Sequence, residues 1–191
     1  PYAGCAITSI IKNSSKDYEY KIYILHEGLN KENLEKLSKL KCDGFDINFK
    51  EMKEGMELIT DRVENRLRCD YFTLTIYFRL FIADLFPEYD KGIYIDSDIV
   101  VPGDISELYN HQLGDNFIGA STDNSIQGIP ELTNYVEEAV GVNRLDYINS
   151  GVLVMNLKKM REVEFSKKFL TLLSTYHFDS VAPDQDYLNA M

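Results

Sequence analysis

A short apolar run that ends in two aspartates constrains the fold of this chain more than any other stretch. Residues 93–95, Ile-Tyr-Ile, lead directly into Asp96-Ser97-Asp98. An apolar run without alternation is typical of a strand that is buried on both faces of a parallel sheet. Carboxylates at the end of such a strand stand where open α/β sheets bind their ligands. The sequence therefore predicts an α/β protein with a ligand site at Asp96 and Asp98.

The spacing of the two aspartates indicates a cation. In an extended backbone, residues i and i+2 point to the same side, so we expect Asp96 and Asp98 to converge. Two close carboxylates repel each other unless a cation joins them, and oxygen ligands suit Mg²⁺ or Mn²⁺ held together with substrate phosphates. The alternative is a polar strand end with solvated carboxylates, because so short a motif also arises by chance. A second Asp-x-Asp indeed occurs at residues 184–186.

Strand and helix patterns alternate along the chain, which predicts a parallel sheet with covering helices. Strands are expected at residues 20–25, 45–49, 93–95, 116–120 and 152–157, and helices at residues 3–12, 30–40, 104–109, 130–140, 158–176 and 183–189. Residues 51–70 are charged and irregular and give no clear prediction.

Composition narrows the class of protein. The formal net charge of −11 argues against nucleic acid or an anionic membrane as the main partner, because phosphate backbones demand a basic face. With 45% hydrophobic residues, 191 residues suit one domain with one core. Cys5, Cys42 and Cys69 follow no zinc pattern and are expected to be reduced thiols in a cytosolic protein. No transmembrane run or signal peptide is visible.

Arg79 is the one cation in the aromatic and apolar stretch 71–86. A buried arginine needs a partner, so the local sequence favours an Arg79 that reaches the surface or pairs with Asp84. The alternative is a guanidinium aimed at a diphosphate or at sugar hydroxyls.

Polar residues also flank other predicted elements. Asp123 follows the strand expected at 116–120, although aspartates in loops mostly form turns. Asn-Ser-Gly at 149–151 precedes the strand expected at 152–157, where glycine permits close approach of a ligand. The acids that open the helix at 183–189 are explained by capping and by the helix dipole.

Four segments in this order resemble glycosyltransferase family 8, the family of bacterial lipopolysaccharide galactosyl- and glucosyltransferases and of glycogenin. They are Tyr77-Phe78-Arg79-Leu80, Ile93-Tyr94-Ile95-Asp96-Ser97-Asp98, Ile148-Asn149-Ser150-Gly151-Val152-Leu153-Val154-Met155-Asn156-Leu157 and Pro183-Asp184-Gln185-Asp186-Tyr187-Leu188-Asn189. The resemblance spans nearly the whole chain. It implies the A-type glycosyltransferase fold, an α/β fold with a Rossmann-like, mostly parallel central sheet and flanking helices.

The resemblance also implies an activity and a nucleotide site. The enzyme would move a hexose from UDP-glucose or UDP-galactose to a saccharide or glycolipid acceptor, such as lipopolysaccharide, with retention at the anomeric carbon. Asp96 and Asp98 match ligands of Mn²⁺ or Mg²⁺ that face the UDP diphosphate, and Ser97 would lie along the ribose. Arg79 matches an arginine that reaches the donor's sugar and phosphates.

The remaining matched positions belong to the donor sugar. Asn149, Ser150 and Gly151 match the segment that lines it, and Asp123 falls where the family places an acid near donor and acceptor. Asp184 and Gln185 match the pair that contacts the sugar hydroxyls, with Gln185 nearest the reacting face. An amide is a poor nucleophile, which favours a front-face route in which UDP takes the acceptor's proton, while Asp184 keeps a covalent intermediate open.

Two family features have no match here. The first strand of the family would precede Pro1, and no histidine matches the family's third metal ligand. We therefore expect residues 1–191 to form a single nucleotide-sugar-binding domain whose first strand and C-terminal segment come from a longer parent chain. A basic C-terminal segment would place a cytoplasmic enzyme at the inner face of the membrane.

Two other readings stay open at this point. A strand that ends in Asp-x-Asp also opens the haloacid-dehalogenase phosphatases, although Ile99-Val100 stands where their Gly-Thr is expected. The chain could also bind a sugar nucleotide without catalysis. Release of UDP from a UDP-hexose would separate a transferase from both.

Overall fold

The computed structural model describes residues 1–52, 74–176 and 180–191. The chain divides into two compact units. The first unit contains Pro1–Glu54 and Ile95–Gln112, and the second contains Gly55–Tyr94 and Leu113–Met191. Almost all of the irregular stretch 51–70, including Cys69, lies outside the described residues. Within the described residues, no helix is both long and apolar enough to cross a membrane.

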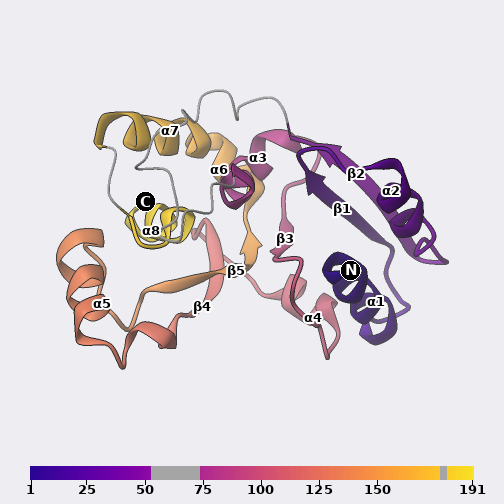
Figure 1. The fold of residues 1–191 in the computed structure, drawn as a ribbon, viewed down its shortest axis with the longest axis horizontal. Coiled ribbons are helices and arrows are strands. Elements are labelled where there is room, and N and C mark those ends of the chain that lie inside the picture. The colour runs from indigo at the N-terminus through magenta and orange to yellow at the C-terminus, as the bar shows by residue number, and fades with distance from the viewer. Residues whose placement is uncertain (53–73, 177–179) are drawn as a thin grey trace. The chain divides into compact units, whose positions relative to one another are not determined.

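The first unit is built on two parallel strands, as the alternating pattern predicts. Strand β1 (Tyr20–His26) pairs in parallel with β2 (Phe45–Glu51). Helix α2 (Lys31–Ser38) connects them and contacts β2 (Figure 1). Because Asn30 accepts the N–H of Asn33, it caps the start of α2 where the sequence places it. The other helices of this unit are α1 (Tyr2–Asn13) and α4 (Ile105–Asn110).

The second unit contains β4 and β5 of a three-stranded sheet with the order β3-β5-β4. The strands are β3 (Gly92–Ile95), β4 (Ile118–Thr122) and β5 (Ile148–Met155), and the division between the units falls just before the last residue of β3. Strand β4 is antiparallel to β5. All four residues of β3 are half-buried, so the prediction of a strand covered fully on both faces is wrong.

Helices of several kinds surround these strands in the second unit. They are η3 (Leu74–Phe81), α3 (Ile82–Leu85), η4 (Asn124–Ile126), α5 (Pro130–Tyr135), η5 (Val136–Val140), α6 (Leu157–Glu162), α7 (Phe165–Tyr176) and α8 (Pro183–Ala190). The helix expected at 130–140 is present, but its second half, η5, is a π-helix. The helix expected at 158–176 is broken into α6 and α7, because Glu164 adopts a left-handed backbone with φ of 52°.

A bulge in β5 places polar residues inside the strand. Ala120 of β4 pairs with Leu153, but Thr122 pairs with Ile148, so two steps along β4 match five along β5. The segment 149–151 therefore lies within β5 rather than before it, which corrects the sequence prediction. Because a bulge interrupts the ladder, backbone groups of this segment can bond to side chains instead.

The core of the second unit includes an aromatic cluster that joins η3, α7 and α8. Phe169 of α7 is fully buried. The rings of Tyr77 and Phe81 on η3 and of Tyr187 on α8 pack around it, with centroid separations of 5.5, 5.9 and 5.3 Å. Since η3 carries Arg79 and α8 carries Gln185, this aromatic cluster fixes the two helices against each other.

Arg161 on α6 offers a test of how this unit is held together. One guanidinium nitrogen donates to the carbonyls of Ala83, Phe86 and Tyr89, at 3.1, 3.3 and 2.9 Å. We expect Arg161→Ala to lower the free energy of unfolding by about 2 kcal/mol, because three part-buried carbonyls lose their donor. Urea denaturation measures this change.

The matched control is Arg144→Ala, which removes an arginine whose half-exposed side chain pairs with Glu137. We expect the control to lose less than about 0.5 kcal/mol, as is usual for surface ion pairs. If both variants lost the same free energy of unfolding, the carbonyl contacts of Arg161 would contribute no more than a surface ion pair, which would contradict the prediction.

Candidate functional site

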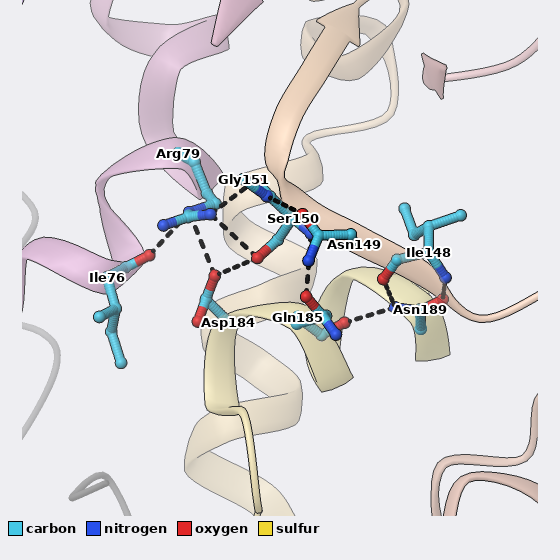
Figure 2. A network of polar contacts seen from close by, with 9 residues as sticks. All are labelled: Ile76, Arg79, Ile148, Asn149, Ser150, Gly151, Asp184, Gln185 and Asn189. Atoms are coloured by element: carbon cyan, nitrogen blue, oxygen red, sulfur yellow. Dashed lines mark hydrogen bonds and ion pairs between the residues drawn. The ribbon is translucent and has the colours of Figure 1, made fainter. Parts of the chain in front are cut away.

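Arg79 is the buried centre of a polar network in the second unit. The side chain is 6% exposed. Its Nη1 donates to the carbonyl oxygen and to Oγ of Ser150, at 2.6 and 2.9 Å, and its Nε lies 3.1 Å from Oδ2 of Asp184 (Figure 2). The Tyr94 ring lies 4.5 Å from the guanidinium carbon. The prediction of a surface arginine or an Asp84 partner is therefore wrong.

Asp184 balances this charge inside the protein. Its carboxylate is 7% exposed, and Oδ2 accepts Ser150 Oγ at 2.9 Å as well as facing Arg79. A buried charge pair is stable only when further hydrogen bonds satisfy its members, and Ser150 provides them to both. Capping and the helix dipole therefore do not account for Asp184, since its side chain is turned inward to specific partners.

The Gln185 side chain bridges two parts of the network. Its Oε1 accepts the backbone N–H of Ser150 at 2.9 Å, and its Nε2 donates to Oδ2 of Asp123 at 2.9 Å. The backbone N–H can only donate and the carboxylate can only accept, so both partners demand the same orientation of the amide. Gln185 is 8% exposed, and hydrogen bonds thus hold both the oxygen and the nitrogen of its amide.

Asp123 brings the network to the surface. Its Oδ1 accepts the N–H and the hydroxyl of Ser125, at 3.0 and 2.6 Å, and Oδ2 also faces Asn149 Nδ2 at 3.5 Å. Burial alone would raise the pKa of Asp123, but hydrogen bonds from Ser125, Gln185 and Asn149 outweigh it and hold the pKa below its ordinary value. An ionised, half-buried carboxylate therefore stands beside the exposed Asn149.

The bulge in β5 explains why this segment can take part. The N–H of Ser150 goes to Gln185, and the N–H of Gly151 goes to Oδ1 of Asn149 at 2.9 Å. Figure 2 shows these contacts together with Asn189, for which the sequence predicted no role in the site. Asn189 bonds both the N–H and the carbonyl of Ile148, at 2.8 and 3.0 Å, and so ties α8 to the start of β5.

The structure thus brings six predicted residues of the second unit into one network. They are Arg79, Asp123, Asn149, Ser150, Asp184 and Gln185. Gly151 adjoins them through its N–H. Two further side chains of α8, the acid Asp186 and the amide Asn189, bond neighbouring segments. The sequence did not predict them as site residues. The only signal for them was their place in the segment 183–189 that carries the family resemblance.

Asp96, Ser97 and Asp98 lie in the first unit. Strand β3 ends at Ile95, and Ser97 and Asp98 form an exposed turn, so the strand alternation used to predict convergence does not apply. Over the described ranges, no three His, Cys, Asp or Glu side chains gather closely enough to hold a metal. Two carboxylates still suit Mg²⁺ or Mn²⁺, which commonly bind one or two protein carboxylates and take their other ligands from phosphates and water.

The chain belongs to glycosyltransferase family 8, whose model matches residues 1–191. A putative glycosyltransferase of Haemophilus influenzae is 28% identical over 195 residues, which cover 100% of this chain and 55% of that protein. The lipopolysaccharide 1,2-glucosyltransferase of Escherichia coli K12 is 28% identical over 197 residues, which cover 98% of this chain and 53% of the enzyme. The chain therefore spans about half the length of these relatives.

Solved structures agree on the fold. The galactosyltransferase LgtC, in complex with donor and acceptor sugar analogs, matches with a TM-score of 0.82 and 26% identity over 99% of this chain and 65% of its own. The bifunctional glycosyltransferase WbbM, in its apo form, matches with a TM-score of 0.79 and 27% identity over 99% of this chain and 35% of its own. The A-type glycosyltransferase fold predicted from the sequence is confirmed.

Proposed function

We propose that this protein transfers a hexose from UDP-glucose or UDP-galactose to a saccharide acceptor, such as lipopolysaccharide or another cell-surface glycan, with retention at the anomeric carbon. The observation that carries the proposal is the network that runs from the buried Arg79–Asp184 pair through Gln185 to Asp123. Amides and carboxylates held in fixed orientations are the groups that recognise sugar hydroxyls. The lipopolysaccharide glucosyltransferase among its relatives supports the choice of donor and acceptor.

Within this proposal, the residues of the network take distinct roles. Gln185 and Asp184 contact the donor hexose, with Gln185 nearest its reacting face. Asn149, Ser150 and Gly151 line the hexose, and Asp123 lies near donor and acceptor. Arg79 is proposed to bind the donor's sugar and phosphates and also bonds Ser150 and Asp184.

The hydrogen bonds favour a front-face reaction over a covalent intermediate. A nucleophilic carboxylate needs an available lone pair directed at the anomeric carbon. Oδ2 of Asp184 instead accepts Ser150 and faces Arg79, so this oxygen is engaged within the protein. Gln185 is an amide and a poor nucleophile. The departing UDP then takes the acceptor's proton, and the protein's contribution is to fix the sugar and to shield it from water.

Asp96 and Asp98 are the proposed ligands of a divalent cation, Mn²⁺ or Mg²⁺, and Ser97 is proposed to lie along the ribose. When bound, the cation offsets negative charge on the UDP diphosphate, and this stabilisation is greatest as the bond to the sugar breaks. The remaining ligands are expected from the diphosphate and water. We further propose a cytoplasmic location, with peripheral association at the inner face of the membrane.

Radiolabelled donors test the function. Full-length protein is incubated with UDP-[¹⁴C]glucose or UDP-[¹⁴C]galactose, Mn²⁺ and a saccharide acceptor, and UDP release, label transfer and the anomeric configuration of the product are measured. The proposal predicts UDP and an α-linked product. Release of inorganic phosphate would indicate the phosphohydrolase, which the family assignment already disfavours. Donor binding without turnover would indicate a non-catalytic binding protein.

A further inference from the structure

The carboxylate of Asp186 lies one residue beyond Gln185 and is 6% exposed. It accepts hydrogen bonds from three separate segments of the second unit. The donors are the Tyr135 hydroxyl at 2.7 Å, the Tyr147 hydroxyl at 2.6 Å, the Ser180 hydroxyl, and the backbone N–H groups of Val181 and Ala182 at 3.1 and 3.0 Å. Oδ2 accepts four of these donors, and Oδ1 accepts the Tyr147 hydroxyl. The carboxylate is therefore held at both oxygens by side chains and backbone groups of its own unit.

The two tyrosines are fixed as donors at neutral pH. Burial first, and then the hydrogen bond to Asp186, raise the pKa of Tyr135 to about 12. The same two causes raise the pKa of Tyr147 far above its ordinary value. Neither hydroxyl ionises at neutral pH, so both stay available as hydrogen-bond donors to Asp186.

Asp186 also ties the start of α8 to the chain before it. The N-cap residue, Ala182, has no side chain that could accept a hydrogen bond, and Asp186 reaches back from inside the helix to accept the N–H groups of Ala182 and Val181. This contact fixes where the first turn of α8 begins, and that turn carries Asp184 and Gln185.

Tyr147 connects Asp186 to the other partners of Gln185. Its hydroxyl donates to Asp186, while its carbonyl accepts the N–H of Asp123 at 2.7 Å. Tyr147 also immediately precedes β5, which supplies the Ser150 N–H. One buried carboxylate thus links the helix that carries Gln185 to the two segments that bond both ends of the Gln185 amide.

We propose that Asp186 is a positioning residue, whose buried carboxylate, bonded at both oxygens, fixes the first turn of α8 so that the Gln185 amide stays between Ser150 and Asp123. The inference rests on the proposed function only in assigning Gln185 to the donor sugar. The placement of Gln185 can be measured without any transfer reaction, because the Ser150 N–H bonds to Oε1 of Gln185 and its exchange with solvent reports on that bond.

Amide hydrogen exchange followed by NMR on the full-length protein is the test. In Asp186→Asn an NH₂ group faces donors, so we expect the Ser150 amide to exchange at least about tenfold faster. The Leu153 amide, further along β5, should be unchanged. Gln185→Ala serves as the positive control for loss of the Ser150 partner. Asp115→Asn, at a fully exposed aspartate of the same unit, is the matched control and should leave both amides unchanged.

Two results would overturn the proposal: a folded Asp186→Asn variant with unchanged Ser150 exchange, or one in which Ser150 and Leu153 accelerate equally. The second would mean that Asp186 serves global stability only. If Asp186→Asn does not fold, Tyr135→Phe/Tyr147→Phe removes two donors but keeps the carboxylate, and the same two amides decide.

Transfer kinetics on the same variants separate positioning from direct catalysis. We expect kcat to fall about tenfold to a hundredfold, as for a reacting group displaced by about 1 Å, while the donor KM stays within about threefold. Tyr135→Phe/Tyr147→Phe should also lower kcat. If Asp186 were itself a catalytic carboxylate, removing two of its donors would raise kcat. A rise in kcat in this double variant would therefore contradict a positioning role. Absence of transfer by the unmodified protein would refute the proposed function, and the exchange measurement would still decide the role of Asp186.

Discussion

Arg79→Met is expected to lower the free energy of unfolding by about 3–5 kcal/mol, the usual cost of removing one partner from a buried ion pair. Methionine retains much of the packing volume but leaves the Asp184 carboxylate buried without its cation. Ser150 also loses a donor to both its carbonyl and its hydroxyl. Urea denaturation gives the change, and Arg144→Met at a half-exposed ion pair is the matched control, with an expected loss under about 0.5 kcal/mol.

A second substitution separates the charge from the function. In Arg79→Met/Asp184→Asn the unpaired buried charge is gone, so we expect at least about half of the lost stability to return. Hexose transfer should stay lost, because neither the guanidinium nor the carboxylate is restored. A double variant as unstable as Arg79→Met alone would contradict the assignment of the loss to an uncompensated charge.

The double variant Asp96→Asn/Asp98→Asn is expected to behave in the opposite way. Asp96 is half-buried and Asp98 is exposed, so the free energy of unfolding should change by less than about 1 kcal/mol. Transfer in the presence of Mn²⁺ should fall at least about a thousandfold, or about 4 kcal/mol in the barrier, because the proposed cation loses both protein carboxylates.

Asp43→Asn/Asp46→Asn is the control for this variant, since it removes the same charge from the same unit at positions outside the proposed site. An equal loss of transfer in the control, or full transfer by Asp96→Asn/Asp98→Asn, would remove Asp96 and Asp98 from the proposed metal site.

Much of the fold follows from local patterns. The helices expected at residues 30–40 and 104–109 agree with α2 and α4 nearly to their ends. Patterns of this kind depend only on neighbours a few residues away, which the sequence shows directly. The break at Glu164 could not be foreseen in this way, because a left-handed backbone at a glutamate has no local signature.

The partners within the network could not be predicted for a related reason. The local sequence offers Asp84 to Arg79, whereas the actual partners are on β5 and α8, far away along the chain. Likewise, acids in the first turn of α8 satisfy the rule for helix dipoles whether they are exposed or buried. Only the packing of α8 against β5 and η3 shows that Asp184 and Asp186 are both buried with specific partners. The family resemblance, carried by short motifs in order, predicted site roles for Asp184 and Gln185 where local chemistry predicted none.

Calorimetric titration of UDP into the full-length protein, with and without Mn²⁺ and beside the Asp96→Asn/Asp98→Asn variant, tests the central claim most directly. The proposed metal-dependent transferase predicts that UDP binds only when Mn²⁺ is present and that the variant loses this binding. UDP binding that ignores Mn²⁺, or that is unchanged in the variant, would contradict the metal site at Asp96 and Asp98. Absence of UDP binding under all conditions would contradict the assignment of a UDP-hexose as donor.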